Sequence, residues 1–379
     1  MNIVITNARI VTADESFMGS VSIANGMITA VDTQAAATAT IDFEGDFLLP
    51  GVVDIHTDNL ERHYFPRPNI DWNAVSAAIA HDGVCLSAGI TTVFDSLSIG
   101  AWGNAAAREL DNLRGLVDGV EHADAHGALR AQHLFHWRCE LTADNLPALV
   151  EEFMPRRLTG LASIMDHTPG QRQYRHLDFF LDRVWRSEGV SEAEIAARIN
   201  DRREKQARNV VPNRASVAAA VRHRQVALAT HDDETIEHIE QGFAVGATIA
   251  EFPVTAEAAA HARARGMVNV MGGPNLIRGG SYSGNVSAAE TANLGLLDGF
   301  ASDYVPRSLI ECAFRLAEPP FGWSLPDAVR TVTQTPARAV GLDDRGAVAP
   351  GKRADILRVR LNAGLPVVRG VWVKGERVG

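Results

Sequence analysis

The sequence has little cysteine, no long apolar run and a deficit of positive charge, and each absence excludes a class of protein. Three cysteines in 379 residues are too few and too scattered for a disulfide framework or a thiolate zinc site. No apolar stretch approaches the roughly eighteen residues of a membrane-spanning helix, and no signal-peptide pattern follows Met1. With 36 Lys and Arg against 46 Asp and Glu, the net charge of −10 argues against a protein that coats nucleic acid or an anionic membrane. We therefore expect a cytoplasmic protein with neither nucleic acid nor membrane as a partner.

The sequence does contain enough apolar residues for a large core, and an unusual number of histidines. Apolar residues make up 46% and charged residues 22%, which are proportions of a globular chain and not of a disordered one. A length of 379 residues suits one large barrel or two domains. The thirteen histidines are the unusual feature, and their positions carry most of the functional argument below.

Both ends of the chain have the pattern of short strands joined by tight turns. Residues 2–11 alternate between apolar and polar, and residues 20–23 and 27–31 flank an Asn-Gly pair, the strongest short hairpin signal. Residues 354–360 and 366–373 repeat this pattern near the C-terminus. We therefore expect residues 1–52 and 345–379 to form one small β-sandwich domain together.

Between these ends, residues 53–344 alternate buried-strand runs with helical periods. The helical stretch 191–208 opens with Ser191 and Glu194 at the spacing of a capping box. Eight strands alternating with helices over about 290 residues predict an α/β fold of the (β/α)8 TIM-barrel type, with a helical, arginine-rich insertion at about 171–224. A doubly wound sheet is the alternative, but no glycine-rich dinucleotide turn follows the first strand. The predicted strands are residues 52–56, 91–95, 132–139, 161–166, 226–230, 247–252, 268–271 and 299–302.

Polar side chains follow the ends of several predicted strands, where the catalytic groups of such barrels lie. A single histidine at a strand end is more often a hydrogen-bonded structural residue. Three imidazoles and three carboxylates together favour one or two divalent metal ions, with zinc first and manganese or iron as alternatives. The candidate ligands are His56, Asp58, Glu140, His167, His231 and Asp303. Other histidines lack this placement and are expected to be structural or exposed, namely His81, His122, His126, His223 and His261.

This layout resembles the amidohydrolase superfamily, which has a first-strand His-x-His or variant, a later bridging carboxylate or lysine, two further histidines and a final aspartate. Residues 335–341 and 351–355 are similar to the closing segment of that superfamily, so the resemblance covers nearly the whole chain. The sequence departs from the pattern in three ways. Asp58 replaces the second histidine, and Glu140 stands where many members have a carboxylated lysine. Two strands are predicted between His231 and Asp303, where the pattern has one.

Longer motifs resemble one branch of the superfamily, the phosphonate-catabolism hydrolases of the carbon–phosphorus lyase pathway. The resemblance implies hydrolysis of the triphosphate of a phosphonate-bearing sugar to its monophosphate, with release of diphosphate. Tyr282 departs from the histidine that is common in that branch. The motifs are residues 56–63 with 66–68, 166–171, 230–235, 271–281 and 283–287.

The resemblance also implies how the candidate ligands divide between two metals. His56, Asp58 and Asp303 are expected to hold one metal. His167 and His231 are expected to hold the other, with Glu140 as the bridge. A hydroxide between the metals would attack the α-phosphorus, and Asp303 is the catalytic residue expected to shuttle the proton.

A triphosphate substrate needs cations and hydrogen-bond donors around it. Residues 172–224 contain twelve Lys and Arg against seven Asp and Glu, which makes this segment locally positive. Arg172, Arg175, Arg202 and Arg203 of this segment are candidates for a lid or clamp over the barrel mouth. The glycine-rich residues 271–285 offer main-chain N–H groups to phosphate oxygens. The expected substrate contacts are Arg62, His63, Arg67, Gln171, Arg172, Arg278, Ser281 and Asn285.

Two other functions remain open at this point. A C–N hydrolase of the same fold, such as a cyclic amidase or a deaminase acting on a small polar substrate, is one alternative. An uncharged cyclic amide would not require the positive segment. A non-catalytic relative is the other alternative, but such a protein should have lost ligands, and all six positions hold metal-binding residue types. The expected partner is a small phosphorylated sugar, and a homo-oligomer is left open.

Overall fold

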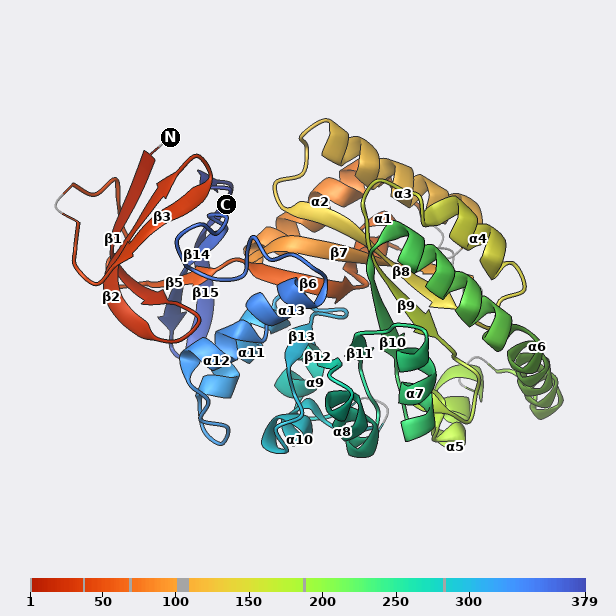
Figure 1. Cartoon of the computed structure of the whole chain (residues 1–379). Helices are drawn as coiled ribbons and strands as arrows, with labels where there is room; N and C mark the ends of the chain where they lie inside the picture. The colour runs from red at the N-terminus through yellow and green to blue at the C-terminus, as the bar shows by residue number, and fades with distance from the viewer. Residues whose placement is uncertain (1, 37, 68–69, 101–108, 187–188, 282–283) are drawn as a thin grey trace. The chain divides into compact units, whose positions relative to one another are not determined.

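The computed structural model describes residues 2–36, 38–67, 70–100, 109–186, 189–281 and 284–379, without the side chains of residues 183 and 184 (Figure 1). Pro68, Tyr282 and Ser283 of the motifs above lie outside the described residues. The chain divides into two compact units, residues 1–95, 114–134 and 299–379 in the first and residues 96–113 and 135–298 in the second. None of the helices in the described ranges combines the length and apolar character needed to span a bilayer.

The first unit contains a sheet built from both ends of the chain, as predicted. Its strand order is β16-β15-β14-β5-β1-β2-β3, with β4 beside β1, and its pairs are antiparallel except those of β1 with β4 and β5. Asn25 and Gly26 form the predicted turn between β2 and β3, both with positive φ. Phe43, Ile356 and Trp372 lie in its buried core. The strands are β1 Asn2–Val11, β2 Ser16–Ala24, β3 Met27–Asp32, β4 Ile41–Asp42, β5 Phe47–Pro50, β14 Ile356–Asn362, β15 Leu365–Val373 and β16 Glu376–Arg377.

The middle of the chain forms an eight-stranded sheet in the order β13-β12-β11-β10-β9-β8-β7-β6. Its first and last strands meet in a parallel bridge between Thr57 and Asp303, so the sheet is a nearly closed barrel. The fold is a (β/α)8 barrel, as predicted, and it includes two strands between His231 and Asp303, β11 and β12. The strands are β6 Val52–Thr57, β7 Ile90–Ile99, β8 Gln132–Glu140, β9 Thr159–Met165, β10 Ala227–His231, β11 Ile249–Glu251, β12 Val268–Gly272 and β13 Gly299–Ala301.

The apolar runs of these strands follow from burial on both faces. All residues of β6 and of β7 are buried. Parallel strands whose two faces are covered need apolar side chains at successive positions and not only at alternate ones. This is why the runs were visible in the sequence. Several of these strands end in or just before a polar residue, as β8 does at Glu140, β10 at His231 and β11 at Glu251.

Helices follow the strands, and most are short (Figure 1). They are α1 Asn59–Tyr64, α2 Ala74–Ser87, α3 Leu110–Ala125, α4 Leu146–Phe153, α5 Leu177–Leu181, α6 Glu192–Arg224, α7 Ile236–Ala244, α8 Ala256–Ala264, α9 Gly273–Arg278, α10 Ala288–Asn293, α11 Ser308–Ala317, α12 Leu325–Arg330 and α13 Gln334–Ala339. A 3-10 turn covers Arg172–Tyr174, and a π-helical turn covers Asp182–Arg186.

The predicted arginine-rich segment is helical, and most of it is α6. The Ser191 hydroxyl accepts a hydrogen bond from Glu194 N (3.3 Å), which is the cap expected from their spacing. The helix is longer than the predicted 191–208: it continues through Pro212 to Arg224, and Gln225 ends it in a left-handed conformation. The predicted domain boundaries at residues 52 and 345 stay a prediction.

Candidate metal centre

Three candidate ligands, here called the His56 group, meet in the first unit where β6 and β13 pair. His56 lies in β6, Asp58 precedes α1, and Asp303 follows β13. One ligand atom of each lies within 4.8 Å of the others, and His56 Nε2 is 3.5 Å from Asp58 Oδ1. The side chain of His56 is 1% exposed and that of Asp58 is 30% exposed. The group is therefore anchored in the barrel wall and reachable from one side.

The main chain of Asp303 is fixed between the other two ligands. Asp303 N donates to His56 O (2.9 Å), and Asp58 N donates to Asp303 O (2.7 Å). The φ of Asp303 is +55°, in the left-handed region that Asp and Asn adopt more readily than other side chains. Strand pairing and this backbone turn together bring an aspartate more than 240 residues away in sequence to His56.

Asp54, which the sequence analysis missed, supports the His56 group from inside the strand. Its Oδ1 accepts from Ser302 N (3.0 Å) and His56 N (3.3 Å). Burial raises the pKa of Asp54 to about 6, although the hydrogen bonds from Ser302 and His56 favour its charged form. The signal in the sequence was an aspartate inside an otherwise apolar run.

A second set of ligands, here called the His167 group, lies in the second unit. It consists of His167, His231 and Asp232, whose ligand atoms lie within 4.8 Å of one another. His231 ends β10, and His167 lies two residues beyond β9, as predicted from the strand ends. Asp232 was not predicted as a ligand, although it follows His231 directly. Asp232 has a left-handed backbone conformation with a φ of +54°, and its N donates to Glu251 O (2.9 Å).

Glu140, the predicted bridging ligand, ends β8 and is buried. Its Oε2 is 2.6 Å from His167 Nδ1, and its Oε1 accepts from the Thr142 hydroxyl (2.7 Å). Each carboxylate oxygen of Glu140 therefore has one short contact. Oε2 contacts His167, a member of the His167 group, and Oε1 contacts Thr142. This arrangement holds Glu140 and His167 at a fixed distance.

Glu251 was also missed, and it orients His231. It ends β11, is buried, and its Oε2 is 2.6 Å from His231 Nδ1. A carboxylate at Nδ1 keeps the proton on that nitrogen and leaves Nε2 to bind a cation, as is usual for metal-ligating histidines. The signal was again a carboxylate inside an apolar run, here the predicted strand 247–252.

The donor chemistry of the His167 group fits a divalent cation. Its side chains offer imidazole nitrogen and carboxylate oxygen, the donors that zinc, manganese and iron accept. Asp232 Oδ2 is buried and has no hydrogen-bond partner among the described residues, although it lies 3.3 Å from His231 Nε2. A buried carboxylate oxygen left without a donor is costly unless a cation binds it. The residues therefore fit a metal ion.

Three predicted substrate contacts lie on or just after α1 in the first unit. Arg62 is exposed, and its guanidinium lies 5.8 Å from the centre of the Tyr304 ring. His63 is half-buried, and its Nε2 is 3.2 Å from Asn59 Nδ2. Burial and the nearby charge of His81 lower the pKa of His63, which favours a neutral imidazole. Arg67 is exposed. Their roles as substrate contacts stay predictions.

Arg172 is buried and committed to protein groups. Its Nη1 donates to Asp233 Oδ1 (2.5 Å) and His231 O (3.0 Å), and its main-chain N donates to Glu234 (2.9 Å). These bonds fix the loop that follows His231. The neighbouring Gln171 is part-buried. Phosphate contacts by these two residues stay predictions.

The other predicted contacts lie around α9 in the second unit. Arg278 ends α9 and is exposed, and Ser281 and Asn285 are part-buried. Asn285 Oδ1 is buried without a hydrogen-bond partner among the described residues. Arg278 and Ser281 have partners of their own. Their roles as substrate contacts also stay predictions.

A further histidine–carboxylate cluster, here called the buried imidazole chain, lies in the first unit. Asp95 accepts from two rings, at His81 Nε2 (2.9 Å) and His133 Nδ1 (2.8 Å). His133 Nε2 lies 3.6 Å from Asp82 Oδ1, and all four side chains are fully buried. Burial opposes the charge of His133, but Asp95 and then Asp82 raise its pKa to about 9. Ligand atoms of His81, Asp95 and His133 lie within 4.8 Å of one another, so the expectation that His81 is structural stays a prediction.

The sequence comparisons give a relative that matches from end to end. The chain is 41% identical over 377 residues to the α-D-ribose 1-methylphosphonate 5-triphosphate diphosphatase of Escherichia coli (strain K12), which covers 99% of this chain and 100% of that protein. The sequence profile of the amidohydrolase family matches residues 215–378.

Solved structures share the fold at low identity. N-acetylglucosamine-6-phosphate deacetylase from Pasteurella multocida has a TM-score of 0.67 at 13% identity, over 100% of both chains. N-isopropylammelide isopropylaminohydrolase from Burkholderia multivorans has a TM-score of 0.65 at 16% identity, over 100% of this chain and 98% of that one. Identities this low support the fold alone. Because the identity to the Escherichia coli enzyme is far higher and extends over both whole chains, this chain belongs to the amidohydrolase family, in the same branch as that diphosphatase.

Proposed function

We propose that this protein hydrolyses α-D-ribose 1-methylphosphonate 5-triphosphate to the 5-phosphate and diphosphate, with one or two divalent metal ions. The observation that carries the proposal is the 41% identity, over 99% of the chain, to an enzyme named for this activity. The imidazoles and carboxylates at the strand ends support it, because they are the donor set that metal-assisted hydrolysis requires.

The proposed ligands form two sets. His56, Asp58 and Asp303 would hold one cation. Glu140, His167 and His231 would hold the other, with Asp232 as a further ligand. Bound divalent cations lower the pKa of water and neutralise charge on phosphoryl oxygens. Zinc is the first choice for such ligands, with manganese and iron as alternatives.

In the proposed reaction, a water oxygen forms a bond to the α-phosphorus. The bond from this phosphorus to the oxygen shared with the β-phosphorus breaks, and diphosphate leaves with the electron pair. Asp303 accepts the proton of the attacking water, since its carboxylate lies within 4.8 Å of the His56 and Asp58 donor atoms. Glu251 and Thr142 keep His231 and Glu140 oriented during this step. Arg62, Arg67 and Arg278 are the exposed arginines proposed to contact the phosphate chain.

The test is diphosphate release by the purified, metal-analysed protein. Substrate, ATP and a panel of small cyclic amides are compared, with diphosphate detected by a coupled pyrophosphatase assay. We expect release from the phosphonate sugar triphosphate, and its loss in Glu140→Gln. His122→Ala is the matched control, because His122 is exposed on α3. Metal-replete protein that cleaves amides and leaves triphosphates intact would establish the C–N hydrolase alternative instead.

Location and assembly belong to the same proposal. We propose a cytoplasmic enzyme, since a phosphorylated sugar is a cytoplasmic substrate and Cys85, Cys139 and Cys312 form no disulfide among the described residues. A homo-oligomer stays open, and light scattering of the purified protein decides it.

A further inference from the structure

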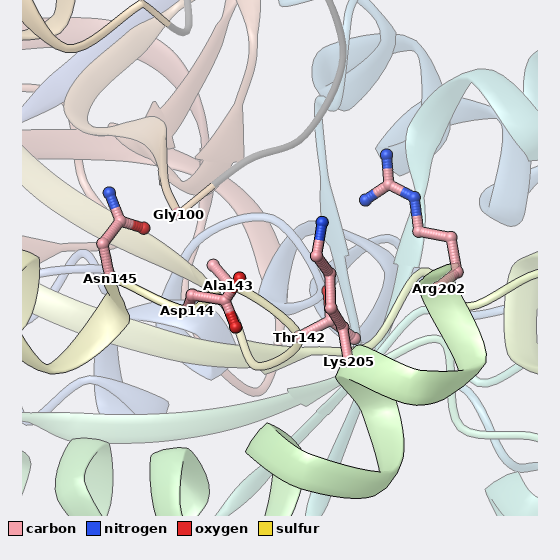
Figure 2. Close-up of a pocket in the computed structure, with 7 residues that line it drawn as sticks. All are labelled: Gly100, Thr142, Ala143, Asp144, Asn145, Arg202 and Lys205. Carbon is pink, nitrogen blue, oxygen red and sulfur yellow. The ribbon is translucent and has the colours of Figure 1, made fainter. Parts of the chain in front are cut away.

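A cavity of about 300 Å³ lies beside the strand end that carries Glu140, and none of the proposed ligands or contacts above lines it. It lies within the second unit. Gly100 at the end of β7 and the residues after β8 form one part, and Arg202 and Lys205 of α6 form the other (Figure 2). This volume corresponds to about ten water molecules of liquid. The cavity is large enough for a compact polyanion.

Three side chains with hydrogen-bond donors line the cavity. In Figure 2 the side-chain nitrogens of Asn145, Lys205 and Arg202 extend to the same side of the loop that carries Thr142 and Asp144. Asn145 precedes α4 but makes no side-chain capping bond, so its amide is not committed to the helix end. The N-terminus of α4 adds a partial positive charge at the same place. Two cations, an amide and a helix end thus lie on one cavity.

The charge balance of the cavity favours an anion. The one carboxylate among its lining residues, Asp144, pairs with Arg208 Nη2 (2.5 Å) and accepts a hydrogen bond from Asn209 Nδ2 (2.8 Å), both on α6. Lys205 pairs with Asp201 on the surface (2.9 Å), and an exposed pair of this kind exchanges readily for a stronger anion. Burial lowers the pKa of Arg202 to about 10, partly offset by the Glu140 charge, so Arg202 stays charged at neutral pH.

The cavity is joined to the metal centre through Thr142. Thr142 lines the cavity, and its hydroxyl donates to Glu140 Oε1 (2.7 Å). Gly100 allows the close approach of the two strand ends, because a Cβ at this position would lie 2.8 Å from that of Ala143. One side chain, Thr142, thus belongs to the cavity wall and contacts a proposed metal ligand.

We propose that this cavity is the subsite for the diphosphate leaving group of a triphosphate substrate, with Arg202, Lys205 and Asn145 as its ligands. The proposal rests on the proposed function. It assigns the cavity to the β- and γ-phosphoryl groups and not to the phosphonate end. The reason is that the leaving diphosphate is bonded directly to the α-phosphorus, which is the atom attacked beside the metal ion that Glu140 is proposed to bind. The phosphonate lies on the far side of the ribose ring.

The test is binding of inorganic diphosphate to the full-length protein, measured by calorimetry with and without added zinc, and inhibition of triphosphate hydrolysis by diphosphate. In Arg202→Gln/Lys205→Gln we expect diphosphate to bind about 10- to 100-fold more weakly, the usual effect of losing charge-assisted hydrogen bonds. The KM for the triphosphate should rise by a similar factor. The control Arg222→Gln/Arg224→Gln removes two charges from the other end of α6 and should leave both constants unchanged.

A second variant covers a failure of the double variant to fold. Asn145→Asp keeps the size of the side chain, and aspartate is as favourable as asparagine at the N-cap of a helix, so the variant should fold. It adds a negative charge to the cavity and should therefore weaken diphosphate binding.

Equal diphosphate binding in the wild type, the double variant and Asn145→Asp would overturn the proposal. So would no diphosphate binding by the wild type. Weaker inhibition by the ribose phosphonate monophosphate product, with diphosphate inhibition unchanged, would also overturn it in favour of the other end of the substrate. If the wild type binds diphosphate through these residues but hydrolyses no triphosphate, the proposed function fails and the anion site stands.

Discussion

The buried imidazole chain and the His167 group are both built from histidine and aspartate side chains, but their surroundings differ. In the buried imidazole chain, each oxygen of Asp95 meets an imidazole, and His133 lies between two carboxylates. In the His167 group, Asp232 Oδ2 has no hydrogen-bond partner among the described residues, and the His167 side chain is 15% exposed. Each cluster has one buried atom without a hydrogen-bond partner among the described residues, His133 Nε2 in the first and Asp232 Oδ2 in the second. The two clusters differ in access, because every side chain of the first is fully buried. Residue type and proximity are therefore shared by the two clusters, and access from solvent is what distinguishes the His167 group.

The largest expected effect comes from breaking the sealed cluster. Asp95→Asn leaves the His133 imidazolium with one carboxylate, and breaking a buried pair costs about 3–5 kcal/mol of unfolding free energy. Urea unfolding measures this loss, with the exposed Asp14→Asn as control. Metal content per folded molecule should not change. A loss below about 1 kcal/mol would mean that the ion pairs of the buried imidazole chain do not stabilise the fold.

The buried imidazole chain should also make the free energy of unfolding depend on pH. Because the pKa of His133 is about 9 when folded and about 6.5 when unfolded, its contribution is complete below pH 6.5 and is lost as the pH rises through 9. The lowered pKa values of Asp82 and Asp95 act in the opposite sense, since burial is outweighed by the His133 charge and their contribution is lost in acid.

We therefore expect the free energy of unfolding to fall by up to about 3 kcal/mol between pH 6 and pH 10. Urea titrations at a series of pH values measure it. In His133→Gln this slope should flatten, and an unchanged slope would assign the pH dependence to other groups.

Asp303→Asn tests the candidate metal ligands that solvent can reach. Asparagine tolerates the left-handed backbone at φ +55° as aspartate does, so the fold and the contacts to His56 and Asp58 should persist. It cannot accept the proton, and we expect most metal to be retained while kcat falls at least about 100-fold. Elemental analysis and kcat measure the two quantities. Near-normal turnover would remove Asp303 from the mechanism.

Glu251→Gln should give the smallest effect. Glu251 holds His231 through Nδ1 and is not proposed as a ligand itself. Loss of such a contact lowers metal affinity by about 10- to 100-fold. Competition with a chelator measures the affinity. Glu257→Gln on α8 is the control, and equal affinity in both variants would assign Glu251 to structure alone.

Much of the fold was predictable because barrel strands are buried on both faces. The eight apolar runs were each found as strands, with ends displaced by a few residues. The Asn25-Gly26 turn and the Ser191 cap were also found, since both depend on local chemistry. The long continuation of α6 past Arg208 was not, because Pro212 is a poor helix residue and tertiary packing outweighs it.

Supporting residues were harder to predict than candidate ligands. His56, His167 and His231 lie at strand ends, where a pattern can find them. Glu251 and Asp54 lie inside apolar runs, and their roles depend on which strand is the neighbour. No spacing along the chain indicates that β11 faces His231 with a carboxylate.

By itself, the sequence determined which segments are strands, where their polar ends lie and which donor types gather there, because these depend on local burial patterns and residue chemistry. Only the tertiary structure decided that Asp303 pairs with His56, that Asp95 is sealed between two imidazoles, and that Arg202 and Lys205 share a cavity with the Glu140 strand end. Those outcomes depend on strand register and on hydrogen-bond saturation between segments far apart in the chain, which a linear pattern does not encode.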